Sequence, residues 1–206
     1  MQGVQPKPLG SHIIPYGTPL HIRDLVITLL RWQFERFPET YPYRYLPNDY
    51  ENTHVTFDVE YNKDSENYGK KPLVIVSHGN QTTNPVVVGD LAAKVTRLGM
   101  ARGSTLVFSD ISAKVISKIK LEAEVIGQTI FGIFLSYRTI LPSVLGIQDI
   151  SSVSMAPATR FDQDDEMYAC QVSMAFCMQY KWVSDRTDPL LEGINVYKTL
   201  LQNKQI

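Results

Sequence analysis

The sequence predicts an α/β (α+β) protein in which a mixed, mainly antiparallel sheet is packed by helices within a single domain. Two stretches carry this prediction. Residues 104–143 begin with period-two alternation of apolar and polar side chains and then change to the three- and four-residue spacing of a helix. Residues 168–182 alternate over their whole length, which is typical of a long strand with one buried face. A strand that leads directly into a helix favours two layers, because the helix can cover the apolar face of the strand.

Composition narrows the class of protein. The chain has 206 residues, of which 44% are hydrophobic and 20% are charged, and its net charge is -1. This is enough apolar surface for a real core, and the near-neutral balance argues against a broad basic face for nucleic acid. No apolar run approaches the ~18 residues of a membrane span, and the N-terminus has no apolar signal region. We therefore expect a soluble protein made in the cytoplasm, with no membrane association.

Residues 1–17 are rich in proline and glycine and lack periodicity, so we expect an extended N-terminal arm. Three apolar side chains stand out near its end: Ile13, Ile14 and Tyr16. Two interpretations are open. The arm is either a floppy terminus or a segment that docks on a surface such as a neighbouring subunit.

Thr18-Pro19 predicts a helix start, with an N-cap hydroxyl followed by proline at the first helical position, and the helix should end before Pro38. A connector rich in tyrosine and proline follows at Thr40–Asn52. Aromatic connectors are frequent at protein interfaces, although structured loops of monomers can look similar. The tyrosines concerned are Tyr41, Tyr43, Tyr45 and Tyr50.

Two strands are expected next. Val55–Tyr61 alternates apolar and polar residues, and Pro72–Ser77 is a short continuous apolar run. The polar segment Asn62–Lys71 between them predicts an antiparallel hairpin with a long loop. Further on, Pro85–Val88 fits either a short strand or a hairpin arm, and Leu91–Leu98 fits a helical turn.

The stretch 104–143 separates its side chains by face. In the strand, Ile111, Ala113, Val115 and Ile119 point one way and Asp110, Ser112, Lys114 and Lys118 point the other. We expect one face to be buried and the other to be wet. The helix stripe then runs from Ala123 to Leu141, and Pro142 should end the helix.

The C-terminal part predicts a strand at Ile147–Met155, an acidic turn at Phe161–Met167 and the long strand 168–182. Asp188-Pro189 repeats the helix-start pattern, so residues 186–206 should form a helical extension beyond a domain at 18–185.

The two cysteines of the chain lie in the same predicted strand. Cys170 and Cys177 should point to opposite faces, about 23 Å apart, and so cannot bridge or share a metal. We expect two small, buried or half-buried hydrophobic side chains in a reducing compartment.

The residues that could carry chemistry do not form a known constellation. Ser77 and His78 are strand neighbours on opposite faces and cannot act as a dyad. The acidic run Asp162–Glu166 lacks the register of an EF-hand, the histidines lack ligand spacing, and no phosphate-binding loop occurs. We therefore predict no catalytic, cofactor-binding or metal-binding residue.

One weak alternative remains. Asp58, Glu60 and Asp110 lie on polar strand faces, and together they could hold the metal of a nuclease or hydrolase. Solvated strand faces produce such groups routinely.

The order of several short segments resembles a known family. The segments are Pro19-Leu-His-Ile-Arg-Asp-Leu-Val, Pro72-Leu-Val-Ile-Val-Ser-His-Gly, Gly103-Ser-Thr-Leu-Val, Lys120-Leu-Glu-Ala-Glu-Val-Ile-Gly and Gln179-Tyr-Lys-Trp. Across residues 19–185 this order resembles the neck and tail-terminator (tail completion) proteins of tailed bacteriophages. The arm and the C-terminal extension go beyond the minimal pattern of that family.

The resemblance implies a tail-terminator-like domain, assembled in the host cytoplasm into a hexameric ring of the virion at the head–tail neck. Such a ring ends the tail tube and docks it to the head connector or stopper protein, and it also meets the sheath if the tail is contractile. DNA passes through the lumen of the ring without sequence-specific binding. No cofactor and no enzymatic activity are implied. A stopper, adaptor or collar subunit is the closest alternative, and a metal-dependent nuclease or hydrolase is a distant one.

From composition we expect the contacts of the ring in the arm, in the tyrosine-rich connector and in the segment Asn80–Arg102. The residues proposed for these contacts are Ile13, Ile14, Tyr16, Tyr41, Tyr43, Tyr45, Tyr50, Val86, Val87 and Val88.

Overall fold

The structure, a computed structural model, describes residues 19–59, 70–83, 94–95, 101–145 and 147–184. The predicted arm, the segment Pro85–Val88 and the C-terminal extension lie outside the described residues. The chain divides into two compact units. The larger unit consists of Gly17–Asn84 and Val107–Met178, and it holds all the helices described below.

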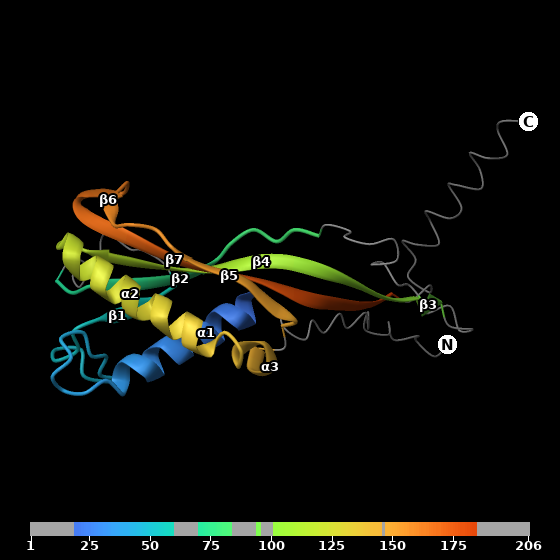
Figure 1. Ribbon diagram of the computed structural model, residues 1–206, viewed down its shortest axis with the longest axis horizontal. Coiled ribbons are helices and arrows are strands. Elements are labelled where there is room, and N and C mark those ends of the chain that lie inside the picture. Colours follow the sequence, from blue (N-terminus) through green and yellow to red (C-terminus); the bar gives the residue numbers. More distant parts are fainter. Residues whose placement is uncertain (1–18, 60–69, 84–93, 96–100, 146, 185–206) are drawn as a thin grey trace, which may run out of the picture. The chain divides into compact units, whose positions relative to one another are not determined.

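Helices and a mixed sheet make up the described chain (Figure 1). The helices are α1 (Pro19–Glu35), α2 (Lys120–Tyr137) and α3 (Leu141–Leu145). The strands are β1 (Thr56–Asp58), β2 (Leu73–His78), β3 (Lys94–Val95), β4 (Ala101–Ser117), β5 (Asp149–Met155), β6 (Thr159–Phe161) and β7 (Asp164–Ser184). Within the described residues they form a seven-stranded sheet of order β1-β2-β4-β7-β5, with β3 on β4 and β6 on β7. The prediction of a mixed, mainly antiparallel sheet packed by helices is confirmed.

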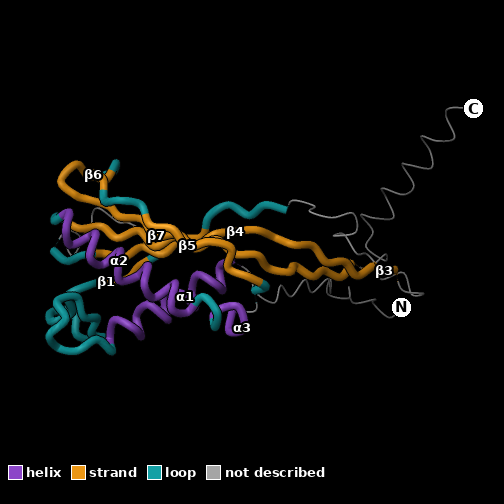
Figure 2. Tube along the Cα trace, in the orientation of Figure 1, coloured by secondary structure: helices purple, strands orange, loops and turns teal. Residues whose placement is uncertain are grey.

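In the larger unit, α1 and α2 lie on the same face of the sheet (Figures 1 and 2). Helix α1 packs against β1 and β2, and α2 packs against β5. The strand residues beneath them are fully buried, among them Val74, Val76, Ile111, Ala113, Val115 and Met174. The main core therefore lies between the helices and the alternate residues of β2, β4 and β7, as the alternation predicted.

The face of the sheet opposite the helices is partly buried, whereas we expected it to be exposed to solvent. The tip of the β6–β7 hairpin bends over this face and brings Phe161 and Met167 against Ile75 and Ile116 in a second, smaller cluster. The ammonium of Lys114 lies 5.6 Å from the centroid of the Phe161 ring. The turn of this hairpin is only Asp162-Gln163, much shorter than the acidic turn Phe161–Met167 predicted from the sequence, and the register of β6 on β7 shifts between Arg160 and Phe161.

The pairing of β1 with β2 is parallel, so the predicted antiparallel hairpin is wrong. Thr56 lies opposite Leu73, and Asp58 lies opposite Ile75. A parallel pair needs a crossover connection of about a dozen residues or more, and the polar segment between these strands is long enough to make one. Alternation within a strand does not report the direction of its neighbour.

The end of α2 also differs from the prediction. The helix stops at Tyr137, and Leu141 and Pro142 begin α3. Proline is accepted in the first turn of a helix, where its missing N–H has no intrahelical partner, so Pro142 starts a helix rather than ending one. At the other end of α2, Ile119 is the N-cap residue and is exposed, so it does not extend the buried face of β4.

A further correction concerns the helical turn expected at Leu91–Leu98. Lys94 and Val95 form β3, which pairs antiparallel with Arg102 and Ala101 of β4. Other predicted elements are confirmed where the structure describes them: α1 begins at Pro19 and ends before Pro38, and β5 lies within the expected stretch. Strand β7 covers the predicted 168–182 but is longer at both ends, and it begins at Asp164, inside the stretch predicted as a turn.

Arginine side chains donate hydrogen bonds to carbonyl groups of the two outermost strands in the sheet order, β1 and β5. The Nη2 atom of Arg31 in α1 donates to the Phe57 carbonyl of β1 at 2.9 Å. Arg138, just after α2, donates to the Ile150 carbonyl of β5 at 3.0 and 3.2 Å and to the Ser151 carbonyl at 3.3 Å. The pairing of β5 with β7 shifts its register at this point. Edge strands offer backbone groups to other chains, and these guanidinium groups occupy some of them.

Candidate functional site

The tyrosine-rich connector folds into an aromatic cluster beside the C-terminal end of α1. The ring of Tyr41 lies 4.5 Å from that of Phe37 and 5.9 Å from that of Tyr43, centroid to centroid. The Tyr45 ring meets Phe57 edge-to-face at 5.4 Å. These three tyrosines are half-buried, so much of their aromatic surface serves packing within the subunit.

Hydrogen bonds tie this cluster to α2. The hydroxyl groups of Tyr41 and Thr129 lie 2.7 Å apart. Burial raises the pKa of the Tyr43 phenol, and the Glu122 carboxylate and Tyr41 add to that rise. Gln33 of α1 donates from its side-chain amide to the hydroxyl of Tyr137 in α2. The connector is therefore joined to α2 through Tyr41, and α1 is joined to α2 through Gln33.

The second half of the connector is held by its own side chains. The Thr53 hydroxyl is buried; it accepts from the Leu46 amide at 2.9 Å and donates to the Val55 carbonyl at 3.1 Å. The Asp49 carboxylate accepts from the side-chain and backbone nitrogens of Asn52 at 2.8 and 3.2 Å. These two hydrogen bonds lower the pKa of Asp49. Asn48 adopts a left-handed conformation, with φ of 65°, which asparagine tolerates better than most residues.

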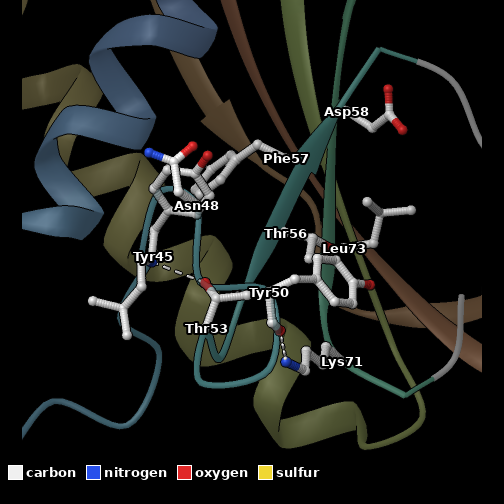
Figure 3. A pocket seen from close by; sticks show the side chains of 10 residues that line it. Tyr45, Asn48, Tyr50, Thr53, Thr56, Phe57, Asp58, Lys71 and Leu73 are labelled. Atoms are coloured by element: carbon white, nitrogen blue, oxygen red, sulfur yellow. Dashed lines mark hydrogen bonds between the residues drawn. The ribbon is translucent and has the colours of Figure 1, made fainter. Parts of the chain in front are cut away.

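A pocket of about 420 Å³ lies between this connector and β1 (Figure 3). Its lining is Tyr45, Leu46, Asn48, Tyr50, Thr53, Thr56, Phe57, Asp58, Lys71 and Leu73. The Lys71 ammonium lies 4.9 Å from the centroid of the exposed Tyr50 ring. It donates to the backbone carbonyl of Tyr50 and, at 3.0 Å, to that of Glu51. Chemically, the pocket offers aromatic faces and hydroxyl groups, and its one ammonium is already hydrogen bonded to the backbone.

The carboxylates considered for a metal site do not meet. Asp58 of β1 lies opposite Ile75 of β2, whereas Asp110 of β4 lies opposite Gly79, which directly follows β2 and is four residues beyond Ile75. That offset alone is about 13 Å. Glu60 lies outside the described residues. No cluster of three or more metal-ligating side chains occurs in the part of the chain that the structure describes.

The hydroxyl group of Ser77 and the thiol groups of Cys170 and Cys177 take part in packing and hydrogen bonding within the fold. The Ser77 hydroxyl lies 2.9 Å from that of Ser112, its cross-strand neighbour, while His78 is exposed. Cys170 and Cys177 are free and buried, as expected. Burial raises the pKa of both thiols; the second cause is the charge of Glu124 for Cys170 and that of Asp149 for Cys177. Neither thiol is poised as a nucleophile.

Six of the ten predicted contact residues lie outside the described residues. They are Ile13, Ile14, Tyr16, Val86, Val87 and Val88. Of the other four, Tyr50 is exposed, and Tyr41, Tyr43 and Tyr45 are half-buried.

A group of exposed apolar side chains on the helices was not predicted from the sequence. Leu25 and Trp32 of α1 and Leu121, Val125 and Leu135 of α2 face solvent. The pattern that could have revealed them is the presence of apolar residues on both sides of α2.

Comparison with known proteins does not identify a family for this chain. No protein-family model matches the sequence, and no curated protein matches it either. None of the helices in the described residues is both long enough and apolar enough to cross a membrane.

Proposed function

We propose that this protein is a structural virion protein of a tailed bacteriophage. Six copies form a ring at the head–tail neck, which ends the tail tube and docks it to the head connector, while DNA passes through the lumen. The proposal rests on the sequence resemblance and on the surface of the larger unit. In this view, function lies in contacts between proteins rather than in a reaction.

The observation that carries the proposal is the amount of apolar surface that the helical layer leaves exposed. Residues such as Leu25, Leu121 and Leu135 belong to well-formed helices but do not contribute to the core. Exposed apolar side chains on the two helices of one layer are available for protein–protein contacts. The order of elements supports the same assignment to the phage neck. The segments on which the resemblance rests lie in or next to α1, β2, the β4–α2 unit and β7.

A stopper, adaptor or collar subunit of the same neck is the second candidate. Such a subunit would use the same kind of surfaces with different neighbours, so the position of the protein in the particle distinguishes the two. A nuclease or hydrolase built on Asp58 and Asp110 has less support, because the β-sheet register separates these residues. Metal-dependent turnover of DNA or of an ester that is lost in Asp110→Ala would revive it.

The test uses tail tubes assembled by the encoding phage in the absence of this protein. We expect the purified protein to bind one end of each tube as a ring of six copies, visible by electron microscopy, and to stop further growth. Tubes from the complete phage, whose ends are already occupied, are the control. Binding to the connector but not to bare tubes would favour the stopper or adaptor, and binding to neither would refute the neck assignment.

A further inference from the structure

The pocket between the connector and β1 holds a positive charge that is not neutralised. Lys71 is half-buried, and its ammonium donates to the backbone carbonyls of Tyr50 and Glu51. Both acceptors are neutral, so these hydrogen bonds fix the position of the ammonium without cancelling its charge. An ammonium has three donors, and one of them remains. Lys71 forms no ion pair within the part of the chain that the structure describes.

The carboxylates near this ammonium are directed elsewhere. Asp58 is the one carboxylate of the lining; it points away from Lys71 (Figure 3) and accepts from the Val59 amide at 2.7 Å. The carboxylate of Asp49, which lies outside the lining, accepts from both nitrogens of Asn52. The pocket therefore favours an anionic group over a cationic one.

The backbone amide of Phe57 is a second donor without an acceptor. Thr56 donates its amide to the Pro72 carbonyl on the β2 side, so the next amide of this strand points the opposite way, away from β2. The Phe57 carbonyl accepts from Arg31, whereas the Phe57 amide has no partner among the described residues. Phe57 is only 7% exposed, and buried backbone amides are rarely left unpaired. Because Phe57 lines the pocket, an acceptor on a bound ligand would satisfy its amide.

The remaining walls of the pocket suit an aromatic or apolar group. The aromatic and aliphatic side chains of the lining are Tyr45, Leu46, Tyr50, Phe57 and Leu73. The Tyr50 ring is 46% exposed, so a ligand ring can pack against it. The volume of about 420 Å³ is within the range of small-molecule sites. A wholly apolar ligand would cover the ammonium without supplying a counter-ion, which is costly.

The walls are held in place by hydrogen bonds within the chain. The buried Thr53 hydroxyl joins the Leu46 amide to the Val55 carbonyl. Lys71, two residues before β2, fixes the backbone at Tyr50. A pocket that is formed in advance loses little conformational freedom when a ligand binds.

We infer that this pocket binds a carboxylate carried on a small aromatic or apolar group. The carboxylate lies at the Lys71 ammonium, and the apolar group packs against Tyr45, Tyr50 and Phe57. Two sources supply this chemistry: a free carboxylic acid and the C-terminal residue of a protein chain. The inference does not rest on the proposed function.

The first test follows the backbone amides of the isotope-labelled full chain by NMR while N-acetylphenylalanine is added. At the ligand efficiency of drug-sized compounds, we expect a dissociation constant on the order of 1 mM, with shifts of the Tyr50, Phe57 and Lys71 amides. The matched probe is N-acetylphenylalaninamide, which has the same ring but no charge. It should bind at least about fivefold more weakly, because it cannot form a charge-assisted hydrogen bond with the ammonium.

Variants of Lys71 test the role of the ammonium. Lys71→Met should abolish the difference between the acid and the amide, and Lys71→Arg should keep it. The matched control is Lys114→Met, since the Lys114 ammonium also lies over a ring, 5.6 Å from the centroid of Phe161, but outside the lining. It should leave both dissociation constants unchanged.

A salt titration of the wild type keeps the test decisive if circular dichroism shows that Lys71→Met does not fold. Raising the NaCl concentration from about 20 to about 500 mM should weaken binding of the acid several-fold and leave that of the amide unchanged.

Hydrocinnamate separates the two sources of the carboxylate. It has the ring and the carboxylate of N-acetylphenylalanine but lacks the acetylated amine of a peptide. Binding at least about fivefold tighter for N-acetylphenylalanine would assign the pocket to a chain terminus, whose backbone then also contributes. Equal or tighter binding of hydrocinnamate would assign it to free carboxylic acids.

Three outcomes would overturn the inference. They are the absence of binding by either acid at about 10 mM, a smaller difference between acid and amide than expected, and shifts confined to residues outside the lining. None of them affects the tail-tube test of the proposed function.

Discussion

Gly127 and Gly132 belong to the same helix and have opposite surroundings, so they form a matched pair of tests. Gly127→Ala should lower the free energy of unfolding by about 1–3 kcal/mol, because the new methyl group must displace Cys170 or lift α2 from the sheet. Gly132→Ala should raise it by about 0.5–1 kcal/mol, because the helix gains propensity with no clash. Urea unfolding of dilute protein measures both. Equal effects of the two substitutions would contradict the described packing of α2.

The buried thiols predict a loss of stability at alkaline pH. Burial raises the pKa of Cys170 and Cys177 above the ordinary value of 9.0. Above that value, the unfolded chain can release these protons and the folded chain resists doing so, so the free energy of unfolding should fall as the pH rises from about 9. Below pH 9 both states keep the protons and the effect vanishes.

Urea unfolding between pH 7 and 10.5 measures this effect, with Cys170→Ala combined with Cys177→Ala as the control. The double variant should be less stable at pH 7 but should have a flatter pH dependence above 9. A thiol reagent should also label the native wild type much more slowly than the unfolded chain. Fast native labelling would contradict the burial of the two sulfurs.

Among single residues, the tyrosines show the limit of reading a site from composition. Their clustering correctly indicated an aromatic loop, but not whether each ring packs on its own chain or on another. Tyr45 contacts the ring of Phe57, and the Tyr41 hydroxyl lies beside that of Thr129, 88 residues further along the same chain. Only Tyr50 is left largely exposed. Such contacts depend on the fold of the chain and are not visible in a local pattern.

Elements defined by local periodicity were predicted well. The start of α1, the β4–α2 junction and the long strand β7 follow from spacing and capping alone. The relations between elements were not predicted well. The direction in which β1 pairs with β2, for example, depends on the path of the connection between them. The bending of the β6–β7 tip over the second face likewise depends on contacts between Phe161 and β2, far apart in sequence.

The arginine caps of the outer strands give a prediction at the scale of the element. Arg138→Ala should lower the free energy of unfolding by about 1 kcal/mol and increase aggregation on warming, because it removes the hydrogen bonds to Ile150 and Ser151 at the register shift of β5. Arg36→Ala is the control, since its guanidinium lies 3.8 Å above the exposed Trp32 ring. Light scattering during thermal unfolding should separate the two variants. Equal aggregation would show that the cap on β5 has no protective role.

At the scale of the whole molecule, the larger unit predicts an order of amide hydrogen exchange. The backbone of β2, of β4 around Ile111–Ile116 and of β7 around Val172–Met178 lies inside the sheet and beneath buried side chains. These amides should exchange only on global unfolding, whereas those of β1, an outer strand of three residues, should exchange through local opening. Exchange followed by mass spectrometry or NMR measures both. Faster exchange in β4 than in β1 would contradict the strand order.

The guanidinium groups of Arg31 and Arg138 also bear on how large an assembly of this protein can become. A sheet that accepts further strands at its margin can lengthen without limit, as fibres do. The Phe57 carbonyl of β1 and the Ile150 and Ser151 carbonyls of β5 are already engaged by these guanidinium groups, so they are not free to pair with an added strand. Repeated contacts at a fixed angle form a closed ring when the rotation closes and an open filament when it does not. The two arginines thus disfavour the lengthening of the sheet by added strands at β1 and β5.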